Sequence, residues 1–198
     1  MKRSVLMTIV LLNLFAAGCA CINPPAYVLS VPLDAQQTGM WCWAAGGEMT
    51  MDFLGGSVDQ CDEANKRFGR TDCCNNPVPS QCVTGGWPEY AKYNFSADET
   101  TWGTALSWPK LAEQIHCKKK PIAFAWGWDG GGGHLMVAAG YASTSVNKWV
   151  LNNNPWPPPN WDPSNPAGGD QSWITYDYFV ASAGSHVHWR DYYNITKH

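Results

Sequence analysis

The chain has 198 residues, of which 13 are Lys or Arg and 16 are Asp or Glu, so its formal net charge is −3 at pH 7. This balance excludes the strongly basic class of nucleic-acid-binding proteins, and the one basic run, Lys118-Lys119-Lys120, is more simply a solvated turn before a proline. The length suits one domain with two small lobes.

The first 18 residues have the pattern of a signal peptide. Lys2 and Arg3 precede an apolar run over 5–17 that is too short to span a bilayer. The small residues after it lead into Cys19 and resemble the lipobox of bacterial lipoproteins, although alanine stands where leucine is usual. We therefore expect a leader over 1–18 and a lipidated Cys19, with simple cleavage near Gly18 as the alternative.

A lipidated cysteine would attach the chain to a membrane in the cell envelope. Ala20 follows Cys19, and a non-acidic residue there resembles the outer-membrane class of lipoproteins, which face the periplasm or the cell surface. Cleavage without lipidation would give a secreted protein. Residues 19–32, with three prolines, then read as a tether from the membrane to a domain over 33–198.

Export changes the meaning of the remaining cysteines. An even number in an exported chain predicts disulfides, whereas zinc sites usually carry C-x-x-C pairs, and none occurs here. We expect no metal and no cofactor. Adjacent Cys73 and Cys74 cannot easily bond each other, so we expect bonds among Cys61, Cys73, Cys74 and Cys82, with Cys42 free; Cys21 and Cys117 are left open.

The first half of the domain has helical patterns. Apolar spacing predicts a helix from Cys42 to Leu54, ended by two glycines. A capping box over 57–60 opens a second helix to Phe68, and Ser107 caps a third helix that runs to about His116.

The second half alternates with period two, which is typical of strands. Strands are predicted over 122–126, 134–141, 148–152, 173–180 and 187–195, with a glycine loop at 130–133 and a Pro/Gly/Asn loop at 155–170. Helices followed by strands indicate an α+β fold of two lobes, a helical N-terminal lobe and an antiparallel sheet lobe.

Cys42 begins the first predicted helix, five and six residues after Gln37 and Gln36. The unpaired N–H groups and positive dipole of a helix N-terminus favour a thiolate. An upstream glutamine can donate to the oxygen that becomes negative when a thiolate attacks a carbonyl. Alone, however, a cysteine before two alanines is more often a buried small residue than a nucleophile.

A predicted hairpin supplies the partners that a nucleophilic thiol needs. If Gly140 or Tyr141 opposes Lys148, His134 faces position 154 or 155. Strand parity puts Asn152 and Asn154 on one face and Asn153 on the other. An asparagine oxygen can accept the ring N–H of the histidine and orient it as a base. Taken alone, His134 could be a strand-end histidine bonded to the backbone, and the asparagines could form a turn. Together with Cys42, these residues favour a catalytic site.

Four segments carry a resemblance to a known family. They are Val31-Pro32-Leu33 with Gln36 and Met40-Trp41-Cys42-Trp43-Ala44-Ala45; Asp72-Cys73-Cys74 with Cys82 and Gly85-Gly86-Trp87-Pro88; Gly133-His134-Leu135-Met136-Val137 with Gly140-Tyr141; and Asn153-Asn154-Pro155-Trp156-Pro157-Pro158. Over roughly residues 31–175 the chain resembles the bacterial papain-like cysteine peptidases, which include AvrRpt2-type effectors and C39-like peptidases.

The resemblance implies a papain-like fold and a role for each site residue. Cys42, on a central helix, would be the nucleophile, His134 the general base, Asn154 the orienting residue and Gln36 the oxyanion donor, with Gln37 as a second candidate. Many relatives carry Asp in place of this asparagine. Plant-type relatives also have a cysteine three residues before the nucleophile, where this chain has glycine, so Cys82 is expected to pair with Cys73 or Cys74.

The leader predicts an exported protein, and the resemblance implies that it is a thiol hydrolase, a cysteine peptidase that cleaves peptide or protein substrates through a thioester acyl-enzyme. We expect it to act as a monomer. Two alternatives stay open: an acyl or amide transferase on the same scaffold, and a catalytically inert, Trp-rich binding lipoprotein.

Overall fold

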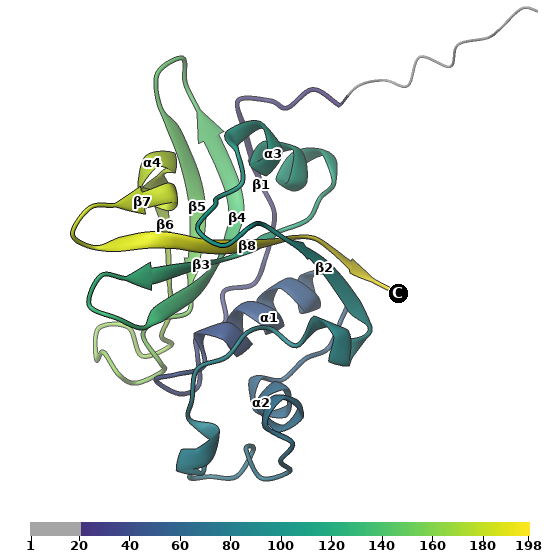
Figure 1. The fold of residues 1–198 in the computed structure, drawn as a ribbon, viewed down its shortest axis with the longest axis vertical. Helices are drawn as coiled ribbons and strands as arrows, with labels where there is room; N and C mark the ends of the chain where they lie inside the picture. The colour runs from purple at the N-terminus through teal and green to yellow at the C-terminus, as the bar shows by residue number, and fades with distance from the viewer. Residues whose placement is uncertain (1–20) are drawn as a thin grey trace, which may run out of the picture.

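The computed structural model describes residues 21–198, so the predicted signal peptide over 1–18 and the lipidated Cys19 lie outside the described residues. Figure 1 shows an antiparallel sheet with α1 lying between it and α2. None of the helices in the described part combines the length and apolarity that a bilayer crossing requires.

The helices belong mainly to the first half of the chain, as predicted. They are α1 (Cys42–Phe53), α2 (Gln60–Phe68), α3 (Trp108–Ala112), which continues as a π-helical turn (Glu113–Cys117), and α4 (Tyr176–Val180). The predicted capping box does not form. Asp59 is the N-cap of α2, while the Asp52 carboxylate at the end of α1 accepts a hydrogen bond from the N–H of Val58 at 2.9 Å.

The sheet has the strand order β2-β8-β3-β4-β5-β6, with antiparallel neighbours throughout; β1 pairs with β4 and β7 with β8. The strands are β1 (Ala26–Val28), β2 (Phe95–Glu99), β3 (Ile122–Trp128), β4 (Gly133–Ser143), β5 (Lys148–Asn154), β6 (Asp170–Thr175), β7 (Ala181–Ser182) and β8 (His186–Lys197). The α+β fold with an antiparallel sheet is confirmed.

Two consecutive glycines let α1 sit close to its neighbours. A Cβ at Gly46 would lie 2.1 Å from Leu135 Cδ2 of β4, and a Cβ at Gly47 would lie 2.6 Å from the carboxylate oxygens of Glu63 on α2. The weak helix propensity of this pair therefore has a packing reason. The close packing of these glycines places α1, and with it Cys42, against the strand that carries His134.

The N-terminal segment differs from the predicted tether over 19–32. Its described part is packed on the domain, because Ala26–Val28 form β1 on β4 and Cys21 forms a disulfide with Cys117. A strand of three residues is too short to show a period-two alternation in the sequence, so the sequence analysis could not predict it.

The predicted strand over 173–180 is also shorter in the structure. β6 ends at Thr175, whose Oγ1 accepts a hydrogen bond from the N–H of Tyr178 at 3.2 Å and so caps α4. The alternation of apolar residues that predicted a strand over 173–180 does not reveal where a helix cap ends the strand.

The expected disulfides form. Cys61 pairs with Cys74 and Cys73 pairs with Cys82, so the adjacent cysteines bond to different partners. Among the described cysteines, Cys42 alone is free.

Candidate active site

Two buried tryptophans hold Cys42 at the first position of α1. The indole N–H of Trp41 donates to the carbonyl of Cys82 at 2.7 Å, and that of Trp43 donates to the carbonyl of Thr84 at 3.1 Å. The start of the helix is thereby fixed to the segment that leads into Gly85 and Gly86, which line the same cleft as Cys42.

The thiol of Cys42 lies close to backbone N–H groups. Burial raises its pKa, and contacts with the N–H groups of Leu135 and Trp43 oppose this shift. Leu135 directly follows His134 on β4, so the thiol lies next to the backbone of the predicted base.

His134 is held by the predicted asparagine. Its Nε2 lies 2.7 Å from Asn154 Oδ1, which also accepts the backbone N–H of Trp156 at 3.1 Å. The second bond identifies this amide atom as the oxygen, so Nε2 is the protonated nitrogen of the neutral ring and Nδ1 is free to accept a proton. Burial lowers the pKa of His134, and the bond with Asn154 opposes that shift.

The hairpin register differs from the predicted one. Ser143, not Gly140 or Tyr141, opposes Lys148, and a bulge shifts the pairing by one residue before Val137 reaches Asn153. Asn154 therefore contacts His134 diagonally across the end of the ladder. The prediction was wrong because the two strands pair up to Ser143 and Lys148, so that the connecting turn is only residues 144–147. The bulge then moves the pairing back by one residue toward the predicted register.

The face assignments from parity agree with the structure. Asn152 lies on the cleft side and donates to Met136 Sδ at 3.5 Å. Asn153 lies on the other side, where its Nδ2 donates to the carbonyl of Pro32 at 3.0 Å and its Oδ1 accepts from Gln171 at 2.7 Å. Of the three asparagines, Asn154 contacts the imidazole.

Of the two glutamines, Gln36 lies in the cleft. Its side chain is buried, and Nε2 donates one hydrogen to the carbonyl of Thr38 at 2.7 Å, which leaves the second hydrogen for a ligand. Its backbone N–H donates to the carbonyl of Pro155 at 2.9 Å, next to Asn154. Gln37 is exposed and does not line the cleft.

The cleft has a volume of about 850 Å³ and joins the helical and sheet sides of the molecule. Of the described residues that line it, Arg67 is the one with a formal charge, and its guanidinium pairs with Glu89 at 2.7 Å. Six tryptophans contribute to the walls: Trp43, Trp87, Trp126, Trp128, Trp156 and Trp189.

Several cleft residues were missed by the sequence analysis. Trp128 lies nearly parallel to the His134 ring, with 6.2 Å between ring centroids, and the backbone N–H of Trp156 fixes Asn154. The turn after Asn154 could have been found, since an asparagine often accepts the N–H two residues on. We find no sequence signal for Trp128.

Two groups of described side chains have the spacing of metal ligands, but the cysteines of both are in disulfides: Cys21, His116 and Cys117, and Asp72, Cys73 and Cys82.

Comparison with known proteins gives one family. The model of the papain-like cysteine protease AvrRpt2 family matches residues 26–164, a range that includes Gln36, Cys42, His134 and Asn154. No curated protein sequence matches the chain. Among solved structures, the ragweed pollen allergen Amb a 11, a cysteine protease in its proform, is 13% identical with a TM-score of 0.48, over 91% of this chain and 67% of that one.

Proposed function

The chain belongs to the AvrRpt2 family of papain-like cysteine proteases, and we propose that it hydrolyses peptide bonds with Cys42 as nucleophile and His134 as base. The 2.7 Å contact between His134 Nε2 and Asn154 Oδ1, in the same cleft as Cys42, carries this assignment. Because Nε2 is occupied, Nδ1 is the nitrogen available to the thiol proton.

The reaction then has two halves. His134 Nδ1 takes the Cys42 proton, and the thiolate attacks the substrate carbonyl to form a tetrahedral oxyanion. The free Nε2 hydrogen of Gln36 and the unpaired N–H groups at the start of α1 stabilise this charge. His134 returns the proton to the leaving amine, a thioester remains, and a water deprotonated by His134 hydrolyses it.

Burial disfavours the charged form of both the Cys42 thiol and the His134 imidazole. It raises the pKa of Cys42 and lowers that of His134, so each group is favoured in its uncharged form. Transfer of the proton creates two opposite charges that attract each other in a partly dry cleft. The active thiolate therefore forms within the pair, as the proton moves, rather than by loss of a proton to water.

The walls of the cleft favour substrates with apolar or aromatic side chains near the cleaved bond. Six tryptophans line it, and Arg67, the charged residue among the described lining, is already paired with Glu89. A charged substrate side chain would lose its hydration without gaining a free partner. Aromatic and aliphatic side chains would bury apolar area against the indole rings.

The thioester leaves a transferase open as a second activity, because an amine could replace water as the acceptor of the acyl group. An inert Trp-rich binding module would use the same cleft without turnover. Incubation with a peptide library separates the three: a peptidase gives free carboxyl termini, a transferase gives joined products, and an inert module gives neither.

We also propose that the chain is exported and anchored through Cys19 in the outer membrane, facing the periplasm or the cell surface. Three disulfides support an oxidising compartment. Mass spectrometry of the mature N-terminus tests the anchor: a diacylglycerol adduct on Cys19 supports it, and an unmodified N-terminus supports secretion instead.

The central experiment compares the mature protein with Cys42→Ala. Labelling by an epoxide thiol inhibitor and cleavage of a peptide library should both be lost, while thermal stability changes little because the removed atom is a single sulfur. Unchanged cleavage by Cys42→Ala would remove the proposed mechanism.

A further inference from the structure

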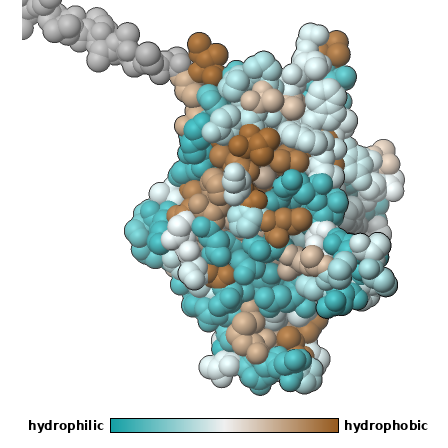
Figure 2. All heavy atoms as spheres, turned by 180° about the vertical axis from the view of Figure 1, so that it is seen from behind, coloured by the Kyte–Doolittle hydropathy of each residue, from teal (hydrophilic) through white to brown (hydrophobic). Residues whose placement is uncertain are grey.

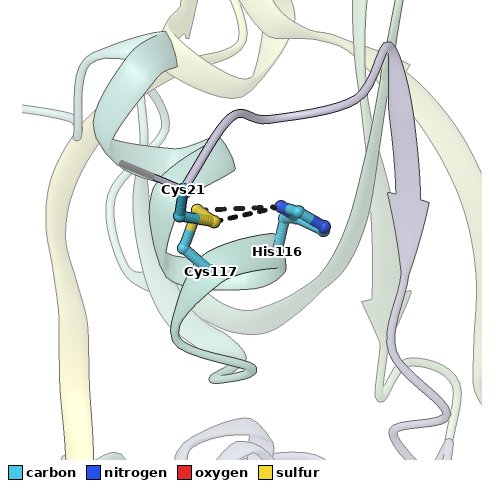
Figure 3. A group of neighbouring side chains, drawn as sticks. All are labelled: Cys21, His116 and Cys117. Carbon is cyan, nitrogen blue, oxygen red and sulfur yellow. Dashed lines mark hydrogen bonds between the residues drawn. A yellow bond between two sulfur atoms is a disulfide. The ribbon is translucent and has the colours of Figure 1, made fainter. Parts of the chain in front are cut away.

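The first described residues are fixed to the domain at one point. Cys21 is bonded to Cys117 at the end of the π-helical turn, and His116 Nδ1 lies 3.5 and 3.6 Å from the two sulfur atoms (Figure 3). Tyr27 packs edge-on against the same imidazole, with ring centroids 4.8 Å apart. The chain at Cys21 therefore cannot move independently of the domain.

The surface around this disulfide is apolar and basic. Ile22 is 84% exposed. Lys118, Lys119 and Lys120 follow Cys117, and Lys119 is exposed with its ammonium 3.8 Å above the Tyr27 ring. We call Ile22 and Lys118–Lys120 the anchor-side surface; Figure 2 shows apolar surface where the described chain begins.

The surface is basic overall: two carboxylates, Glu113 and Asp98, face its three lysines and the neighbouring Lys110. Glu113 is the acidic residue paired with it, in contact with Lys118 at 3.3 Å and with Lys110 at 3.4 Å. Lys120 instead donates to the hydroxyl of Thr196 and to the carbonyl of Asn194. Lys119 has no carboxylate partner within the described residues, so its charge is available to an outside anion.

The short stretch between Cys19 and Cys21 limits the distance between a lipid on Cys19 and the anchor-side surface. Cys21 is two residues after Cys19, and an extended chain adds at most about 3.6 Å per residue. A lipid on Cys19 would thus hold the disulfide within roughly 7 Å of the lipidated residue. An ordinary flexible tether of a dozen residues would allow several times that distance.

We propose that the anchor-side surface rests on the phospholipid headgroups of the membrane, with Lys119 on the phosphates and Ile22 in the interface. This inference rests on the proposed lipidation of Cys19. Lysines near an anionic bilayer attract it within a Debye length, and an exposed isoleucine favours the interface.

The docked orientation would point the active cleft away from the bilayer. None of the residues that line the cleft belongs to 21–33 or 108–121. Figure 1 shows the start of the described chain beside α3, at the end of the molecule opposite to α2, and far from the first turn of α1. The peptidase would then act on substrates that approach from the aqueous side.

Lysine footprinting of the lipidated full-length protein tests the orientation. The protein is reconstituted in vesicles of phosphatidylethanolamine and phosphatidylglycerol and treated with an amine-acetylating reagent, beside Cys19→Ser protein mixed with the same vesicles. The acetylation rate of Lys119 should fall about fivefold or more on lipidation, whereas exposed Lys92 should not change. Equal rates at Lys119, or equal protection of both lysines, would overturn the proposal.

A second variant separates docking from mere closeness to the anchor. Ile22→Asp with Lys119→Glu keeps the lipid and changes two side chains that are largely outside the core, so folding should be preserved. Protection of Lys118 and Lys120 should then decrease; unchanged protection would show that the surface contributes nothing. Mass spectrometry of the N-terminus is done first. An absent lipid refutes the anchor, whereas a lipid together with a reactive Lys119 refutes the docking and leaves the anchor in place.

Discussion

Asn154 Oδ1 lies 2.7 Å from His134 Nε2, although the last ladder pair between their strands joins Val137 and Asn153. The contact is diagonal and exists because β5 stops pairing with β4 one residue before Asn154. The Asn154 oxygen is held a second time by the N–H of Trp156. Orientation of the His134 ring thus depends on the turn after β5 as much as on the strand.

Substitution of Asn154 tests this arrangement. Asn154→Ala should lower kcat and leave a measurable residual rate, because the imidazole still reaches the usable tautomer part of the time. Asn154→Asp should retain much of the activity, since a carboxylate accepts the same N–H, whereas His134→Ala removes the proton acceptor and should be far worse. Asn152→Ala is the matched control. If it reduces kcat more than Asn154→Ala, Asn152 is the orienting residue instead.

The two adjacent glutamines form a natural pair for testing the oxyanion site. Gln36→Ala should cost on the order of 10²–10³ in kcat with little change in KM, because its amide acts on the charge that develops in the transition state. Gln37→Ala should stay near the wild-type rate, since its side chain is exposed outside the cleft. Steady-state kinetics on one peptide decide this, and equal losses would argue for a structural effect.

Stability should depend on the protonation of Glu48. Burial raises its pKa from 4.5 to about 7, and neighbouring Asp34 and Asp52 add to the shift. The folded protein keeps a proton that the unfolded chain loses between these values, so this group destabilises the fold as pH rises from 4.5 to 7. Glu48→Gln should raise Tm above pH 7 and change it little near pH 4.

The expected gain has a simple structural basis and a control. Gln60 Nε2 donates to Glu48 Oε2 at 2.7 Å, and a glutamine oxygen at position 48 can accept the same bond. Asp129→Asn, on the exposed turn after β3, is the matched variant. A Tm for Glu48→Gln that follows the wild-type pH curve would contradict the argument.

The two short disulfides should differ in their effect on activity. The bonded cysteines are 13 residues apart in Cys61–Cys74 and 9 apart in Cys73–Cys82. Loss of either bond should lower the free energy of unfolding by roughly 3 kcal/mol in the chain-entropy model. Replacing Cys73 and Cys82 by serine should also lower kcat, because the Cys82 carbonyl accepts the indole N–H of Trp41, which directly precedes Cys42. Replacing Cys61 and Cys74 should affect stability alone. Urea unfolding and kcat, measured on both double variants, test this.

Local patterns in the sequence were sufficient for much of the site. The apolar spacing after Cys42 predicted α1 and its N-terminal thiol, because helix periodicity and end effects depend on near neighbours. Strand parity separated Asn153 from Asn152 and Asn154 for the same reason. The leader pattern, likewise local, gave the expectation of export.

Tertiary structure decided what depends on distant segments. The β4–β5 register followed from the short turn between Ser143 and Lys148 and from a bulge. The contact of His134 with Asn154 rather than Asn152 followed from that register, and the position of Gln36 from its bond to Pro155. The packing of residues 21–32 depends on β4 and Cys117, which lie about a hundred residues away. Such pairings are set by the fit of buried surfaces, which alternation along one segment does not encode.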